Sequence, residues 1–165
     1  ASTGNIPVSL APTDLNVLLS QVCGEYQQRL EKQVLEPVLS LCEPGAAAMA
    51  DGRLLWRVLD NLMSNICKYA MPGTRVYLST EAGEDGVRMV VKNISRYPLN
   101  ISADELTERF VRGDSSRSTE GSGLGLSIAT SLTAIQGGDF RLTIDGDLFK
   151  VTLTLPRAEQ EEKQE

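Results

Sequence analysis

Apolar residues in the first quarter of the chain recur at helical and then at strand-like intervals. Leucine, valine and tyrosine follow a helical spacing over residues 15–30, which predicts an amphipathic helix. Thr13 is the expected N-cap of that helix, and residues 7–11 are expected to form a short edge strand before it. Residues 33–42 are rich in Val and Leu and predict a strand. Pro37 indicates that this strand lies at an edge of the sheet or contains a bulge.

A second and stronger helical pattern follows in the middle of the chain. A turn at Pro44-Gly45 and a short strand at residues 46–50 are expected to precede it. Asp51 is a good N-cap, and the helix is predicted to run to about Tyr69, where Met71-Pro72-Gly73 ends it. The expected core face of this helix consists of Leu55, Val58, Leu59, Leu62 and Ile66.

The next part of the chain changes from helical to strand-like spacing and then loses periodicity. Residues 75–81 and 87–93 predict two strands, separated by a turn at residues 83–86. Residues 94–122 are polar and aperiodic, with one short helix expected at residues 103–106. Long loops of this kind usually carry function.

The last third of the chain predicts one helix and a hairpin. The helix is expected over residues 122–136, with Gly137-Gly138 as its stop. Strands at residues 140–144 and 149–155 form a hairpin across Asp145-Gly146-Asp147. Helices thus alternate irregularly with neighbouring antiparallel strands. The expected fold class is α/β, a two-layer sandwich in which helices pack on one face of a mixed, mostly antiparallel sheet.

The chain has 165 residues, enough for one domain with a hydrophobic core. Residues 1–6 are interpreted as a linker or cloning remnant, residues 7–156 as the folded domain, and residues 157–165 as a disordered acidic tail. No apolar run approaches the length that spans a bilayer, and no signal peptide is recognisable. A membrane anchor of any longer parent protein is therefore expected outside this chain.

Charge and composition exclude several classes of function. A net charge of −6 argues against nucleic-acid binding, which needs a basic surface. The three cysteines have no metal-ligand spacing and fit reduced thiols in the cytosol. Histidine is absent, which excludes a Ser-His-Asp triad, a histidine metal site and a phosphohistidine on this chain.

Four polar residues of the middle helix carry the first candidate chemistry. Asn61, Asn65, Lys68 and Tyr69 share one helix face, which is expected to lie opposite the apolar face. An amide oxygen can ligate Mg²⁺, a lysine can neutralise phosphate, and a tyrosine ring can pack against a ribose or a base. This stripe can therefore serve a nucleotide, although an ordinary solvated helix face is the alternative interpretation.

A glycine-rich segment opens the last helix. The N–H groups of a first helical turn and the helix dipole favour a bound phosphate, and glycines allow its close approach. The order of residues excludes the dinucleotide fingerprint and the Walker loop, and a flexible hinge is the alternative. The segment consists of Gly121, Ser122, Gly123, Leu124, Gly125 and Leu126.

The loop before these glycines is rich in arginine. Arg109, Arg112 and Arg117 surround Phe110, and arginine forks suit phosphate oxygens. A surface loop with ion pairs to neighbouring carboxylates would have the same composition. The loop is therefore a second candidate for phosphate contacts.

Taken in order, these blocks resemble the N box, F box and G2 box of histidine kinase ATP-binding domains. That family belongs to the ATPase superfamily of gyrase, MutL and the ninety-kilodalton heat-shock chaperone, and the resemblance covers residues 8–156. It implies that Asn65 is the Mg²⁺ ligand, that Asn61 and Lys68 lie beside the phosphates, and that residues 109–122 form a lid over ATP. It also implies phosphate binding by Gly121, Gly123 and Gly125.

One block departs from the family pattern. The G1 box usually reads D-x-G-x-G, but residues 91–98 read Val-Lys-Asn-Ile-Ser-Arg-Tyr-Pro. Asn93 occupies the place of the aspartate that reads the adenine amino group, and Ser95 and Tyr97 occupy glycine positions. An amide oxygen can accept the same hydrogen bond. The departure implies weaker and less adenine-selective binding.

The resemblance also suggests the reaction. Hydrolytic members place a water-activating glutamate where this chain has Asn61, and an amide is no general base. The expected function is therefore to bind Mg-ATP and donate its γ-phosphoryl group to a histidine on a separate dimerisation domain. The implied partners are that domain and a response regulator. The implied parent protein is a homodimeric membrane sensor. This chain would be its cytoplasmic catalytic domain, which is expected to be monomeric by itself. A degenerate nucleotide-binding regulatory module and an anti-sigma-factor-type serine kinase remain as alternatives.

Overall fold

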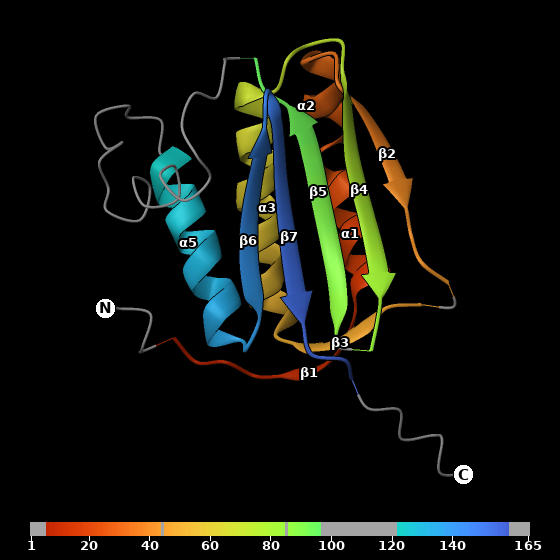
Figure 1. The fold of residues 1–165 in the computed structure, drawn as a ribbon, viewed down its shortest axis with the longest axis vertical. Helices are drawn as coiled ribbons and strands as arrows, with labels where there is room; N and C mark the ends of the chain where they lie inside the picture. Colours follow the sequence, from red (N-terminus) through yellow and green to blue (C-terminus); the bar gives the residue numbers. More distant parts are fainter. Residues whose placement is uncertain (1–5, 44, 85, 97–121, 159–165) are drawn as a thin grey trace.

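The computed structural model describes residues 6–43, 45–84, 86–96 and 122–158, which form a sheet backed by helices (Figure 1). The sheet has five strands in the order β2-β4-β5-β7-β6. β2 runs parallel to β4, and the other three pairs are antiparallel. The strands are β2 Glu36–Ser40, β4 Arg75–Ala82, β5 Val87–Ile94, β6 Asp139–Asp145 and β7 Leu148–Leu155.

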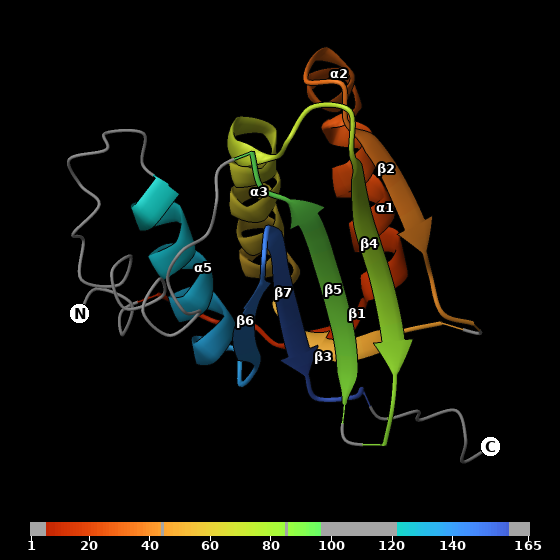
Figure 2. The ribbon, with the colours of Figure 1, turned by 45° about the horizontal axis from the view of Figure 1, so that its top comes forward.

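The helices lie together on one face of this sheet (Figure 2). They are α1 Leu15–Glu25, α2 Gln27–Lys32, α3 Gly52–Tyr69 and α5 Ser122–Ile135. A separate pair of short strands, β1 Ala11–Asp14 and β3 Ala47–Ala50, pairs antiparallel at the end where α3 begins. The expected two-layer α/β sandwich with a mixed sheet is therefore confirmed.

The core lies between the sheet and α3. Alternate residues of the strands point toward the helices, as the two-residue period of a strand requires. On β7 these are Val151, Leu153 and Leu155, each at most 1% exposed. The facing side of α3 buries Leu54, Leu55, Val58, Leu59, Leu62, Met63, Ile66 and Cys67.

The predicted boundaries of α3 are confirmed. The Asp51 carboxylate accepts hydrogen bonds from the backbone N–H groups of Arg53 (3.0 Å) and Leu54 (3.3 Å), which makes it the N-cap. The helix ends at Tyr69, and Gly73 turns the chain at a φ of 86°. A left-handed φ of this kind favours glycine, so the stop signal in the sequence has a direct conformational cause.

The start of the chain differs from the prediction. The first strand is Ala11–Asp14 rather than residues 7–11, because its register is set by pairing with β3. Asp14, not Thr13, caps α1, and its carboxylate accepts from the N–H groups of Asn16 and Val17. The Thr13 hydroxyl instead donates to the carbonyl of Ala50 at 3.1 Å. Thr13 belongs to the strand pairing and is not available as a cap.

The single helix predicted over residues 15–30 is interrupted at Tyr26. Tyr26 separates α1 from α2, and its hydroxyl bonds to the carboxylate of Asp60 on α3. Burial raises the pKa of Tyr26, and the hydrogen bond to Asp60 raises it further. The interruption thus coincides with a contact between helices distant in sequence. The following strand, β2, is also shorter than residues 33–42, because Val34 turns the chain at a φ of 59°.

The remaining elements are close to the prediction. β5 extends one residue further, to Ile94, and α5 ends at Ile135, one residue earlier. β6 is one residue longer at each end, and a two-residue turn follows it, with Gly146 at a φ of 64°. The short helix expected at residues 103–106 lies outside the described residues.

Beyond β7 the chain continues to pack against the domain. The Ala158 N–H donates to the carbonyl of Ala47 at 3.1 Å, and the Met49 N–H donates to the carbonyl of Pro156 at 2.8 Å. The Ala158 side chain is buried. The packed part of the chain thus continues two residues past the expected domain boundary at 156.

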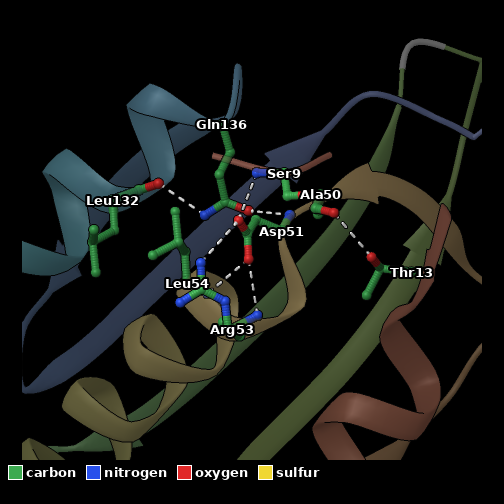
Figure 3. A network of polar contacts seen from close by, with 8 residues as sticks. All are labelled: Ser9, Thr13, Ala50, Asp51, Arg53, Leu54, Leu132 and Gln136. Carbon is green, nitrogen blue, oxygen red and sulfur yellow. Dashed lines mark hydrogen bonds and ion pairs between the residues drawn. The ribbon is translucent and has the colours of Figure 1, made fainter. Parts of the chain in front are cut away.

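A buried polar cluster, here called the Asp51 junction, joins three segments (Figure 3). Its members are Ser9, Asp51, Gln136 and Leu132. The Asp51 carboxylate accepts from the Ser9 N–H, and the Asp51 N–H donates to the Gln136 side-chain oxygen, both at 2.8 Å. The Gln136 amide nitrogen donates to the Leu132 carbonyl, also at 2.8 Å. The junction therefore fixes the end of α5 to the start of α3 and to the chain before β1.

The charge of Asp51 gives a testable pH dependence. Burial alone would raise the pKa of this carboxyl, but hydrogen bonds from Ser9, Leu54 and Arg53 and the nearby Arg53 guanidinium lower it below the ordinary 3.8. A lowered folded pKa contributes stability above the unfolded value, and that stability is lost as the pH falls through the folded pKa. Asp51→Asn keeps a good N-cap without the charge.

We predict that Asp51→Asn lowers the free energy of unfolding at neutral pH by about 1 kcal/mol. Urea denaturation from neutral to acid pH should show the two proteins converging below pH 3.8, where the parent carboxylate loses its charge. A constant difference down to the lowest pH would contradict the assignment.

Candidate functional site

One side of α3 changes from apolar to polar along its length. Leu54 and Val58 are buried, and Asn61 and Asn65 follow each of them by seven residues, about two helical turns, on nearly the same side. Both asparagines are half-buried. The polar stripe therefore borders the core side of α3, and the expectation that it lies opposite the core is wrong.

The change in character follows the packing of α5 on α3. The two helices contact each other, and α5 buries Leu126, Ala129, Leu132 and Thr133. In Figures 1 and 2 the helices lie closer together where α3 begins and α5 ends than at their opposite ends. Asn61 and Asn65 thus occur on the half of α3 that is nearer the start of α5.

The end of β5 is joined to the end of α3 by backbone hydrogen bonds. The Met71 N–H donates to the carbonyl of Ile94, and the Arg96 N–H donates to the carbonyl of Tyr69, both at 2.8 Å. An isolated bridge pairs Ala70 with Ser95. Residues that are far apart in sequence are therefore held side by side at the polar end of α3.

Asn93 contributes another amide at this place. It is 5% exposed and lies on the helix-facing side of β5, in alternation with Met89 and Val91. An amide at this position can donate and accept hydrogen bonds to a ligand at the end of β5. Ser95, two residues on, is also buried.

The glycine-rich segment forms the first turns of α5, as predicted. Residues 122–125 have helical backbone, so the first N–H groups of α5 have no partner within the helix. Such a helix start favours an anion. Leu126 is buried in the core, which leaves its backbone for any contact with a ligand. Arg112, Arg117 and Gly121 lie outside the described residues.

The other predicted site residues lie at the end of α3. Lys68 is exposed and Tyr69 is half-buried. Among the described residues there is no group of three or more Cys, Asp or Glu placed to hold a metal ion. In the same residues, no helix has the length and apolar character needed to cross a bilayer. The candidate site thus consists of amides, a lysine, a tyrosine and a helix start.

Sequence reasoning did not assign a role to Gln136. Its side chain is 1% exposed and belongs to the Asp51 junction. A signal was present in the sequence, because Gln136 follows Ile128 and Leu132 at intervals of four residues and so falls on the apolar stripe of the helix. A polar residue on such a stripe indicates a buried hydrogen bond.

Comparison with known proteins agrees with this geometry. Residues 50–159 match the family described as histidine kinase-, DNA gyrase B-, and HSP90-like ATPase. The match covers more than half of the chain, so the chain belongs to this ATPase family. Membership implies that the domain binds ATP, and the family inferred from the sequence motifs is confirmed.

Individual relatives are sensor kinases. The chain is 32% identical over 145 residues to the probable sensor protein PcoS of Escherichia coli. This alignment covers 85% of this chain and 31% of PcoS. Full-length ShkA, solved in complex with AMPPNP, is 28% identical with a TM-score of 0.71, over 93% of this chain and 33% of ShkA. The catalytic domain of histidine kinase ThkA superposes with a TM-score of 0.78 at 21% identity, over 90% of this chain and 96% of that domain. The chain thus spans about a third of PcoS, and the ThkA likeness shows the shared fold.

The position of Asn65 predicts a conflict between stability and function. Because Val58 precedes it on the same side of α3, leucine at position 65 would extend the apolar side of the helix. We predict that Asn65→Leu raises the free energy of unfolding by roughly 0.5–1 kcal/mol, measured by urea denaturation. Ser64→Leu controls for helix propensity, because Ser64 is also half-buried but lies about 100° around the helix from Asn65. A loss of stability relative to that control would mean that the amide itself stabilises the fold.

Proposed function

We propose that this chain is the ATP-binding catalytic domain of a sensor histidine kinase. It binds Mg-ATP and donates the γ-phosphoryl group to a histidine on a separate dimerisation domain. The observation that carries the proposal is the juxtaposition of the α3 amides with the end of β5, on the half of α3 nearer the start of α5. The names of the similar proteins, a sensor protein and the catalytic domain of a histidine kinase, support it.

Each residue has a role that its chemistry allows. Asn65 supplies a hard oxygen ligand to Mg²⁺, with Asn61 beside it. Lys68 neutralises phosphate charge, and the N–H groups at the start of α5 bind phosphate oxygens. Tyr69 packs against the ribose or base. Arg112 and Arg117, from the loop before α5, add guanidinium contacts to the phosphates.

The base is read at the end of β5. Asn93 accepts the adenine amino hydrogen with its side-chain oxygen, and Ser95 lines the same place. The AMPPNP complex of ShkA, a relative at 28% identity, supports a nucleotide in this fold. Asn93, which is 5% exposed, then binds the base at the edge of the core.

Transfer depends on position and charge rather than on a general base in this chain. Phosphoryl transfer needs the donor held in line with the nucleophile and its developing charge neutralised. Asn61 stands where a hydrolytic relative would need a carboxylate, and an amide does not activate water. The chain contains no histidine, so the acceptor comes from its partner.

The setting follows from the same proposal. The parent protein is a homodimer with a histidine-bearing dimerisation domain, and a response regulator receives the phosphoryl group from that histidine. This domain is then the cytoplasmic part of a membrane sensor and is monomeric when isolated. PcoS, of which this chain covers 31%, is described as a sensor protein, which supports the assignment.

Phosphotransfer to an added dimerisation domain tests the proposal. Incubated with labelled Mg-ATP and a separately produced histidine-bearing domain, the chain should transfer acid-labile label to that domain and retain none itself. Asn65→Ala removes the Mg²⁺ ligand and should slow transfer more than tenfold, about 1.4 kcal/mol, while Asn65→Asp retains an oxygen. Acid-stable label on a serine would indicate the serine-kinase alternative. ATP binding without transfer would indicate the degenerate module.

Asn93 predicts reduced base selectivity. An asparagine can flip to satisfy either the adenine amino group or the guanine carbonyl, whereas an aspartate only accepts hydrogen bonds. Asn93→Asp should therefore increase discrimination between ATP and GTP and raise ATP affinity by about 0.5–1.5 kcal/mol. Calorimetric titration of both nucleotides against both proteins measures this. An unchanged ratio of the two affinities would show that residue 93 does not read the base.

A further inference from the structure

We infer that Gln136 is a positioning residue for the nucleotide site, although it lies at the opposite end of α5 from the phosphate-binding start. It acts by fixing the direction in which α5 leaves the Asp51 junction. This inference rests on the proposed function, because the quantity that it controls is the placement of the start of α5 against bound phosphate.

The Gln136 amide makes two buried hydrogen bonds. Its oxygen accepts from the Asp51 N–H, and its nitrogen donates to the Leu132 carbonyl, both at 2.8 Å. The side chain is 1% exposed. Apolar side chains of similar volume would fill the same space without the cost of desolvating an amide. What the amide adds is direction, since hydrogen bonds constrain angle as well as distance.

The end of α5 is anchored more tightly than its remaining length. Two residues after Gln136, a Cβ added at Gly138 would meet the Leu155 side chain at 2.7 Å and the Thr154 carbonyl at 3.0 Å. The chain therefore presses against β7 at this point. Toward its start, α5 contacts α3 and buries the apolar residues Leu126, Ala129 and Leu132. Apolar packing tolerates small shifts in orientation better than hydrogen bonds do.

A small rotation at the anchored end is amplified at the start of the helix. α5 has 14 residues, and at about 1.5 Å per residue it is roughly 20 Å long. A tilt of roughly 5° at Gln136 would then move the first turn by roughly 2 Å. Functional contacts need placement to within about 0.5 Å, and displacements of about 1 Å can cost a hundredfold in rate.

Through Asp51, the junction also fixes the direction of α5 relative to α3, which carries the amides of the site. Asp51 is the N-cap of α3, and the same helix carries Asn61 and Asn65 near its other end. The hydrogen bond between Gln136 and Asp51 thus links the residue that follows α5 to the N-cap of α3. The two helices are held at their common end, and the ligand contacts lie at the opposite end.

The effect should depend on the number of phosphates in the ligand. Adenosine contacts the end of β5 and the end of α3, whereas only the phosphates of ATP reach the start of α5. Gln136→Met keeps the length of the side chain and removes both hydrogen bonds. Calorimetric titration should show ATP affinity reduced at least tenfold and adenosine affinity changed less than twofold.

Thr80→Val is the matched control. Thr80 is 4% exposed, and its hydroxyl donates to Asn16 at 2.6 Å and accepts from the Cys42 N–H at 2.9 Å, in a partly buried cluster that includes no residue of α5. This variant should lose stability while the ratio of ATP to adenosine affinity stays that of the parent. If Gln136→Met does not fold, Gln136→Leu, which also removes both hydrogen bonds, is measured instead and should also weaken ATP selectively.

The outcomes separate this inference from the proposed function. Equal losses for ATP and adenosine, or no loss for either, in the Gln136 variant would overturn the positioning role and leave the kinase proposal intact. A parent protein that binds no ATP would overturn both. A parent protein that binds ATP but transfers no phosphoryl group would overturn the kinase proposal alone, while a selective loss of ATP affinity would still support the role of Gln136.

Discussion

The packing of α3 against the sheet and against its neighbour α5 is the interaction on which the rest of the structure depends. Eight apolar residues of this helix are buried, each contributing on the order of 1.5–3 kcal/mol if fully removed from water. With the helix held along most of its length, its last turns can carry amides at positions where further apolar residues would pack. Asn61 and Asn65 therefore reduce the apolar packing locally, and the burial of the remaining residues of α3 offsets the lost stability.

The same logic applies to the end of β5. Asn93 is buried on the helix-facing side of a strand whose preceding inward residues, Met89 and Val91, are apolar. Backbone hydrogen bonds from Met71 and Arg96 hold this strand end against α3 independently of any side chain. The frame of the site is thus built from main-chain contacts.

Local sequence signals predicted those elements that local interactions determine. The long apolar pattern of α3 and its cap Asp51 were recognised because helix period and capping are encoded within a few residues. The cap of α1 was assigned to Thr13 instead of Asp14 because both residue types cap helices, and only pairing with β3 excludes Thr13. The interruption at Tyr26 was missed for a related reason, since its partner Asp60 lies 34 residues away. In the site, residue types indicated chemistry, but the placement of the amide stripe beside the core depended on α5.

The small strand β3 has a mechanical consequence. β1 pairs along one of its edges, and the Pro156 and Ala158 segment bonds to the other. Both ends of the described chain therefore leave the domain from a single narrow ribbon. A pull between them would load the hydrogen bonds of β3 first. The hydrogen bond from the Ser9 N–H to the Asp51 carboxylate would transmit such a force directly to the start of α3.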